Sequence, residues 1–227
     1  MNTVYKMFQE PELNDYFHAF NSENIQCYDS LKNSLLKTIK VKGSILEFGI
    51  GRAKSVIITC HLINEYKIKK KYIAFDSFEG FGNISSEDKS YRNPKKGDWS
   101  SSPKKQFKYT KENIKKIVSY HIYKKNFQNV KFIKGFVENT LSKEIKKIKS
   151  ISFINLDLDL YSGHKVVLEY TWEKLSKNGL IYFDDIFPGR KLNAFPGAAI
   201  AVKEFFKNKK IIRFTCNLRK NLIIQKI

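Results

Sequence analysis

Residues 45–51 read ILEFGIG, an apolar run that leads directly into two closely spaced glycines. The apolar run, residues 45–50, predicts a buried β-strand, and the pattern over residues 53–66 predicts a helix just after it. A glycine-rich turn between a strand and a helix lets a ligand approach the backbone closely. We therefore expect an α/β fold whose first strong strand leads into a ligand-binding turn. A plain tight turn is the alternative.

The rest of the chain continues this alternation of apolar strands and helices. Such strands, separated by helices, are typical of a parallel sheet that is covered on both faces. The last two strands are joined by residues 217–220 only. Because a parallel crossover needs a dozen or more residues, these strands predict an antiparallel hairpin. The expected strands lie at residues 45–50, 72–78, 129–134, 151–157, 179–184, 211–216 and 221–225, and the expected helices at residues 53–66, 111–123, 163–175 and 197–206.

Two segments do not fit the alternation. Residues 1–40 predict a helical N-terminal extension, ahead of a main domain at residues 41–227. Residues 82–109 are rich in Gly, Pro, Ser and charge, with little apolar pattern. An irregular loop of this length in a compact domain is a functional lid or a mobile insertion, and the sequence leaves both open. The residues expected to share one face of the N-terminal helix are Leu31, Leu35, Leu36 and Ile39.

Composition and charge limit the classes of function. The chain of 227 residues has 42 Lys and Arg against 22 Asp and Glu, a formal charge of +20, which predicts affinity for anionic partners. Only five of the basic residues are Arg, fewer than a nucleic-acid reader with bidentate contacts usually carries. The apolar and aromatic content excludes a disordered chain.

Localisation follows from three further features of the sequence. No apolar run approaches the length of about 18 residues that spans a bilayer, so we expect no membrane insertion. The first residues contain no apolar core of a secretory signal. Three widely separated cysteines form no CxxC pair and suit a reducing compartment. We therefore expect a cytoplasmic protein.

Acidic residues near the glycine turn favour a nucleotide-like cofactor. Lys54 stands where the dinucleotide pattern G-x-G-x-x-G requires a third glycine, which weakens a nicotinamide or flavin interpretation. An acidic residue followed by G-x-G, here Glu47, Gly49 and Gly51, is instead common in proteins that bind S-adenosylmethionine. Asp76 ends the second expected strand 25 residues after Gly51, and an acid at about this spacing accepts ribose hydroxyls in nucleotide-binding folds.

Four carboxylates follow two other expected strands. Asp157 and Asp159 lie in NLDLDLY at the end of one strand, and Asp184 and Asp185 close the next. The ends of adjacent parallel strands lie roughly 5 Å apart, so the four side chains are expected in one crevice. Like charges this close need neutralisation, and hard oxygen ligands suit Mg²⁺, Mn²⁺ or Ca²⁺. Helix capping is the alternative for Asp185, and whether His164 faces the site stays open.

With these residues, the chain resembles the macrocin O-methyltransferase family, class I enzymes that use S-adenosylmethionine to methylate sugar hydroxyls. The resemblance runs from about residue 45 to residue 206 and implies a Rossmann-like, seven-stranded sheet whose last strand is antiparallel. Its most specific part is DxDLY followed by DD. The segments that carry it are, in family order, LEFGIGRAKS, AFDSFEGF, KGFVENTL, INLDLDLY, LIYFDDI and GAAIAVKEFF.

The resemblance implies roles for individual residues. Asp159 matches the position proposed as general base. The chain departs from the family pattern at two places. It has Ala53 where the family often has Gly, and FGN at residues 81–83 where the family usually has Leu-Pro. The residues that match cofactor-binding positions are Glu47, Gly49, Gly51 and Ser55 in the turn, Asp76 and Ser77 beside the ribose, and Gly135 and Phe136 beside the adenine. The residues that match the metal ligands, with Mg²⁺ the most expected ion, are Asp157, Asp184 and Asp185.

The function implied is methylation of a sugar hydroxyl on a nucleotide-activated or glycan-linked sugar in surface-polysaccharide or natural-product biosynthesis. A bound metal would orient two adjacent hydroxyls of the acceptor, and Asp159 would take the proton. The expected partners are this small acceptor and a second copy of the chain in a homo-oligomer, a dimer. A catechol-type small-molecule O-methyltransferase is one alternative. An RNA-binding or RNA-modifying protein, suggested by the charge alone, is another, although no RNA-binding module is visible.

Overall fold

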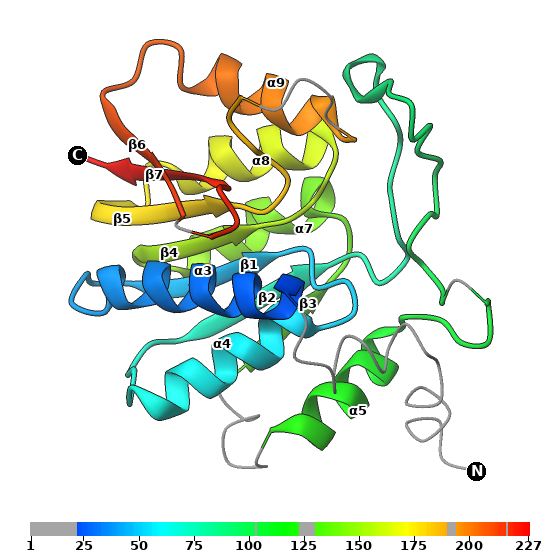
Figure 1. Ribbon diagram of the computed structural model, residues 1–227, viewed down its shortest axis with the longest axis horizontal. Coiled ribbons are helices and arrows are strands. Elements are labelled where there is room, and N and C mark those ends of the chain that lie inside the picture. Colours follow the sequence, from blue (N-terminus) through cyan, green and yellow to red (C-terminus); the bar gives the residue numbers. More distant parts are fainter. Residues whose placement is uncertain (1–21, 103, 123–129, 190–193, 217) are drawn as a thin grey trace.

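The computed structural model describes residues 22–102, 104–122, 130–189, 194–216 and 218–227. Its centre is a seven-stranded sheet in the order β3-β2-β1-β4-β5-β7-β6 (Figure 1). All neighbouring pairs are parallel except β5 with β7 and β7 with β6, so the expected parallel sheet with an antiparallel C-terminal hairpin is confirmed. The strands are β1 (Ser44–Phe48), β2 (Tyr72–Asp76), β3 (Val130–Lys134), β4 (Ile151–Leu156), β5 (Leu175–Phe183), β6 (Ile211–Thr215) and β7 (Leu222–Lys226).

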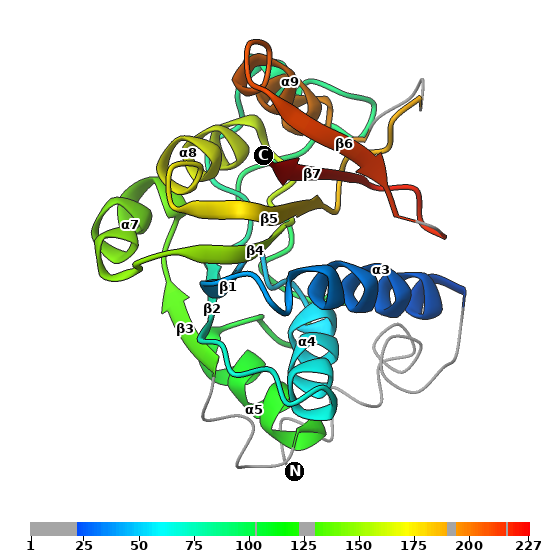
Figure 2. The same ribbon diagram turned by 90° about the vertical axis from the view of Figure 1, so that its left-hand side faces the viewer.

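Helices cover both faces of the sheet (Figure 2). One face carries α3 (Ser22–Thr38), α4 (Lys54–Glu65) and α5 (Lys111–His121), and the other carries α7 (Val137–Glu144), α8 (Tyr161–Thr171) and α9 (Pro196–Phe205). Among the described residues, no helix is long and apolar enough to cross a membrane.

Alternation along the strands divides the apolar side chains between two cores. In β2, Tyr72 and Ala74 join the core under α3, α4 and α5, whereas Ile73 and Phe75 join the core under α7, α8 and α9. This follows because successive side chains of a strand point to opposite faces of the sheet. Both faces are covered, so the central strands β1, β2 and β4 are almost entirely buried and mostly apolar, as the sequence predicts.

Helix α3 covers the sheet beside α4 and contributes to the first of these cores. Leu31 and Leu35 are buried, as the predicted apolar face requires. Leu36 is only half-buried, and Ile39 lies exposed just beyond the end of the helix. Residues 1–21 of the expected N-terminal extension lie outside the described part of the chain.

Two predicted boundaries were wrong. The helix expected over residues 163–175 is α8, which ends at Thr171, and β5 already begins at Leu175. The pairing of β5 with β4 explains the error. Ile151 of β4 pairs with Leu175 of β5, but Phe153, two residues later, pairs with Leu180, five residues later. The polar residues between Leu175 and Leu180 therefore bulge out of the ladder. Helix α7 was not predicted, because its eight residues contain only two buried side chains, too few for a clear apolar period.

Residues 82–109 form an irregular segment attached to the second helical layer. The Asp88 carboxylate is buried, and its Oδ1 accepts a hydrogen bond from the backbone N–H of Tyr161 at 2.8 Å, at the start of α8. Gly197 of α9 faces the same carboxylate so closely that a Cβ would collide with it. The Ser90 hydroxyl also donates to the carbonyl of Ala194 at 2.7 Å. The segment is therefore anchored to α8 and to the approach to α9.

Candidate functional site

A cavity of about 300 Å³ opens at the carboxyl edge of the sheet, beyond β1, β2, β4 and β5. Ligands of open α/β sheets bind at this edge, where the strand order reverses. The structure brings ten of the twelve predicted site residues into its lining, whereas Glu47 and Gly135 lie behind it. The ten lining residues are Gly49, Gly51, Ser55, Asp76, Ser77, Phe136, Asp157, Asp159, Asp184 and Asp185.

Glu47 lies beneath the glycine turn. Its side chain is 1% exposed, and its carboxylate accepts hydrogen bonds from the hydroxyls of Ser55 and Tyr72. Ser55 belongs to the first turn of α4, so this contact ties β1 to the helix that follows the turn. The structure therefore gives Glu47 a position from which it supports the turn.

Burial of Glu47 predicts a pH-dependent effect of the Glu47→Gln substitution. Burial raises the pKa of Glu47 from its ordinary 4.5 to about 7. A raised folded-state pKa means that folding favours the protonated form, so stability from this group is lost as the pH rises from about 4.5 to about 7. The amide that replaces it carries no charge at any pH, so the variant should gain on the order of 3 kcal/mol relative to the native chain between pH 4.5 and pH 8. The free energy of unfolding is measured in urea at pH 4.5 and pH 8. The control is Glu169→Gln, on the exposed face of α8.

Asp76 closes the glycine turn from the neighbouring strand. Its Oδ2 accepts hydrogen bonds from the backbone N–H groups of Ile50 at 2.7 Å and Gly51 at 3.3 Å, and its Oδ1 accepts from Phe78 N–H at 2.6 Å. Burial raises the pKa of Asp76, and these three donors act in the opposite direction. The carboxylate therefore orders the turn from which a cofactor would be bound.

Left-handed backbone conformations at the turn explain why glycine is needed there. Gly49 has φ +86°, and a Cβ on it would collide with the backbone carbonyl of Asp157. Ala53 has φ +69°, a conformation that glycine adopts at lower cost. This accounts for the glycine that the resembling family often has at this position.

Gly135 follows β3 behind the cavity. It has φ +129°, and its N–H donates to the Asp76 carbonyl at 2.9 Å. The adjacent Phe136 lines the cavity. The Gly135 hydrogen bond thus ties the backbone just before Phe136 to the end of β2, and the Phe136 ring lies close to Gly82.

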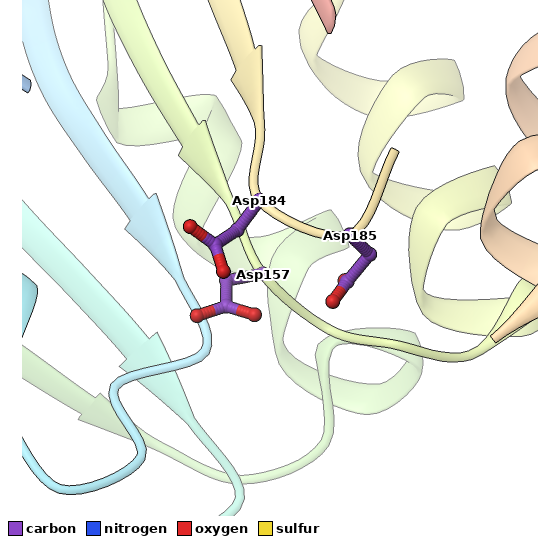
Figure 3. A group of neighbouring side chains, drawn as sticks. All are labelled: Asp157, Asp184 and Asp185. Atoms are coloured by element: carbon purple, nitrogen blue, oxygen red, sulfur yellow. The ribbon is translucent and has the colours of Figure 1, made fainter. Parts of the chain in front are cut away.

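Three carboxylates converge at the ends of β4 and β5 (Figure 3). Oxygen atoms of Asp157, Asp184 and Asp185 lie within 4.8 Å of one another. Burial and the neighbouring carboxylates raise the pKa values of Asp157 and Asp185 well above their ordinary range. Three convergent oxygen donors with excess negative charge fit a hard divalent cation.

Arg219 reaches this cluster from the loop of the β6–β7 hairpin, and sequence reasoning missed it. Its guanidinium forms a two-pronged ion pair with the Asp184 carboxylate, with one N–O distance of 3.0 Å. The Tyr182 hydroxyl donates to the same carboxylate at 3.1 Å. A resident cation therefore neutralises one member of the cluster. The only sequence signal for it was the brevity of the hairpin loop, which returns to the end of β5.

Asp159 lies between the carboxylate cluster and α8. Its backbone is left-handed, with φ +59°, and its N–H donates to Asp185 Oδ2 at 2.9 Å. Burial and the nearby Asp157 raise the pKa of Asp159 to about 7. Asp159 is partly buried and is one of the residues that line the cavity.

His164 does not line the cavity but lies behind the cluster. It is fully buried, and burial lowers its pKa to about 4. Its Nδ1 lies 3.0 Å from the Leu160 carbonyl, and its Nε2 lies 3.9 Å from Asp185 Oδ2. The neutral imidazole therefore packs against the cluster without contributing charge.

Comparisons with known proteins show the family and the fold of the chain. The sequence profile of the family described as Macrocin-O-methyltransferase (TylF) matches residues 26–218. No curated protein sequence matches the chain significantly. Several solved structures share its fold, and the following three are among them.

The O-methyltransferase NovP superposes with a TM-score of 0.70 at 19% identity, over 89% of this chain and 80% of its own. The calicheamicin methyltransferase CalS11, described elsewhere as a TDP-rhamnose 3′-O-methyltransferase, superposes with a TM-score of 0.77 at 20% identity, over 98% of this chain and 89% of its own. An O-methyltransferase from Bacillus cereus in complex with SAH superposes with a TM-score of 0.53 at 11% identity, over 98% and 90%. These likenesses show the class I methyltransferase fold.

Proposed function

This chain belongs to the macrocin O-methyltransferase family, and we propose that it transfers the methyl group of S-adenosylmethionine to a hydroxyl of a sugar. The observation that carries the proposal is one cavity lined both by the glycine turn with Asp76 and by the carboxylates after β4 and β5. The glycine turn with Asp76 suits a nucleoside cofactor, and the carboxylates suit an acceptor with adjacent hydroxyls. Methyl transfer requires the cofactor and the acceptor to bind side by side.

The cofactor would lie across the ends of β1 and β2. Gly51 leaves open space for it against the backbone, and Gly49 lets the turn pack on the Asp157 carbonyl. Asp76 and Ser77 lie where its ribose would be held. Phe136 would pack beside the adenine, and Ser55 lies in the first turn of α4. Glu47 and Gly135 support these groups from behind, as their buried contacts indicate.

A divalent cation, with Mg²⁺ the expected ion, would be held by Asp157, Asp184 and Asp185. When bound, it would bind the hydroxyls of the acceptor and lower their pKa. Arg219 holds the Asp184 carboxylate in place through its paired hydrogen bonds. Asp159 would accept the proton of the reacting hydroxyl, and a pKa of about 7 suits a base working near neutral pH. Methyl transfer forms the new O–C bond as the sulfonium S–C bond breaks.

The acceptor would be a nucleotide-activated or glycan-linked sugar, in surface-polysaccharide or natural-product biosynthesis in the cytoplasm. The charge of +20 favours an anionic acceptor, and CalS11, with the same fold, is described as acting on TDP-rhamnose. A catechol-type acceptor would also offer two adjacent hydroxyls to the carboxylate cluster. Assay of sugar and catechol acceptors side by side separates the two.

Calorimetric titration of S-adenosylhomocysteine is the direct test of the cofactor assignment. We expect binding in the micromolar range, and a loss of at least tenfold in Asp76→Ala, because this change removes the carboxylate that orders the glycine turn. Glu173→Gln, exposed just beyond the end of α8, is the control and should bind normally. Absence of binding by the native chain would refute the proposed function.

A further inference from the structure

Two arginines and a tryptophan meet at the mouth of the cavity. The guanidinium carbons of Arg52 and Arg92 lie 5.6 Å and 5.5 Å from the centre of the Trp99 ring, and that of Arg92 also lies 5.5 Å from the centre of the Phe195 ring. Arg52 and Trp99 line the same cavity as Asp159. These groups come from the glycine turn, from residues 82–109 and from the approach to α9, so the fold assembles them from distant parts of the chain.

The backbone holds Trp99 in place. The Phe81 N–H donates to the Asp98 carbonyl at 2.9 Å, and the Gly97 N–H donates to the Phe81 carbonyl at 2.9 Å. Gly80 allows this crossing, because a Cβ on it would collide with the Asp98 carbonyl. Trp99 itself has φ +68°, which is unusual for a bulky residue and is typical of functional sites. The backbone that carries Trp99 is therefore held against the segment that follows β2.

Arg52 and Arg92 bring two positive charges to this mouth. Within the part of the chain that the structure describes, the Arg92 guanidinium has no carboxylate at ion-pair distance, and the side chain is exposed. Residues 82–109 carry seven basic and three acidic side chains. Arginine is rare in this chain, with five among 42 basic residues, yet Arg52 and Arg219 line this cavity and Arg92 lies on the ring of Trp99, another lining residue.

We propose that Arg52 and Arg92, held on the Trp99 ring, form an anion subsite that binds the phosphate groups of a nucleotide-activated sugar while its sugar reaches the carboxylate cluster. The guanidinium fork matches phosphate oxygens in pairs, which an ammonium group cannot do. Trp99 is 43% exposed, so the two guanidinium groups lie at the surface, where a phosphate group can reach them. This inference rests on the proposed function and names the part of the acceptor that the site recognises.

The test is titration of thymidine diphosphate into protein saturated with S-adenosylhomocysteine. We expect the native chain to bind it and Arg92→Gln to bind it at least tenfold more weakly, because a charged hydrogen-bonding group is lost. Arg92→Lys keeps the charge without the fork and should be intermediate. Arg213→Gln removes the same charge from exposed β6 and should bind like the native chain.

Three further titrations separate the sources of binding. Inorganic pyrophosphate should compete with thymidine diphosphate and lose affinity in Arg92→Gln, whereas uncharged thymidine should bind weakly and equally to both. S-adenosylhomocysteine should bind Arg92→Gln and the native chain alike, so its loss in both would refute the proposed function rather than the subsite. Equal binding of thymidine diphosphate by Arg92→Gln and the native chain, or no binding by the native chain, would overturn the subsite.

Discussion

The Asp159→Asn variant is expected to lower kcat for methyl transfer by about a hundredfold to ten-thousandfold, the usual contribution of a general base. The carboxylate lines the cavity beside Asp157, and burial raises its pKa to about 7. An amide of the same shape cannot accept the proton of the acceptor hydroxyl. The measurement is kcat with saturating S-adenosylmethionine and acceptor.

The choice of Asn makes this test specific. Asp159 has φ +59°, and Asn is one of the few residues that adopt the left-handed region readily, so the loop should keep its course. Binding of S-adenosylhomocysteine should be unchanged, and Glu169→Gln on exposed α8 should retain full activity. A kcat for Asp159→Asn within tenfold of the native value would remove Asp159 from the role of base.

Removal of divalent cations is expected to reduce methyl transfer to the background rate, and addition of Mg²⁺ should restore it. The carboxylate oxygens of Asp157, Asp184 and Asp185 lie within 4.8 Å of one another, and mutual repulsion opposes this arrangement. A cation that binds only the folded chain should also raise the melting temperature, by on the order of 5 °C at roughly a hundred times its Kd. Activity and melting temperature are measured with EDTA and after titration with Mg²⁺.

The thermal shift has its own controls. Asp157→Asn should abolish most of the rise with Mg²⁺, because it replaces a charged carboxylate of the cluster by a neutral amide. Glu173→Gln, exposed beyond the end of α8 and outside the cavity lining, should keep the full rise. If EDTA-treated protein retains its activity, or if Mg²⁺ shifts Asp157→Asn as much as the native chain, the metal assignment is wrong.

The sheet could be predicted because its strands carry strong local signals. Apolar runs such as residues 151–156 bury both faces, and their length excludes most helices. The antiparallel hairpin followed from the shortness of its loop alone. The start of β5 could not be predicted, because the polar residues after Leu175 imitate a turn and only the register with β4 shows that they bulge out.

The candidate site likewise has a part that the sequence predicts and a part that it does not. Its carboxylates sit at strand ends, so the sheet topology was enough to gather Asp157, Asp184 and Asp185. Arg219 was missed because it lies 34 residues beyond Asp185, and its contact with Asp184 depends on the course of the hairpin loop. The position of Glu47 behind the turn depends on the Tyr72 hydroxyl reaching it from the next strand, which no spacing in the sequence reveals.

The buried Asp88 has a consequence for engineering acceptor specificity. Residues 82–109 carry Arg92 and Trp99, so they are the natural segment to exchange between relatives in order to change the acceptor. However, Asp88 joins this segment to the first turn of α8 and fits only because α9 has Gly197 opposite it. The contact with α8 uses a backbone N–H and does not depend on its sequence, whereas the contact with α9 requires a glycine. A transplanted segment therefore needs its own matching α9, and chimeras should take both from one parent.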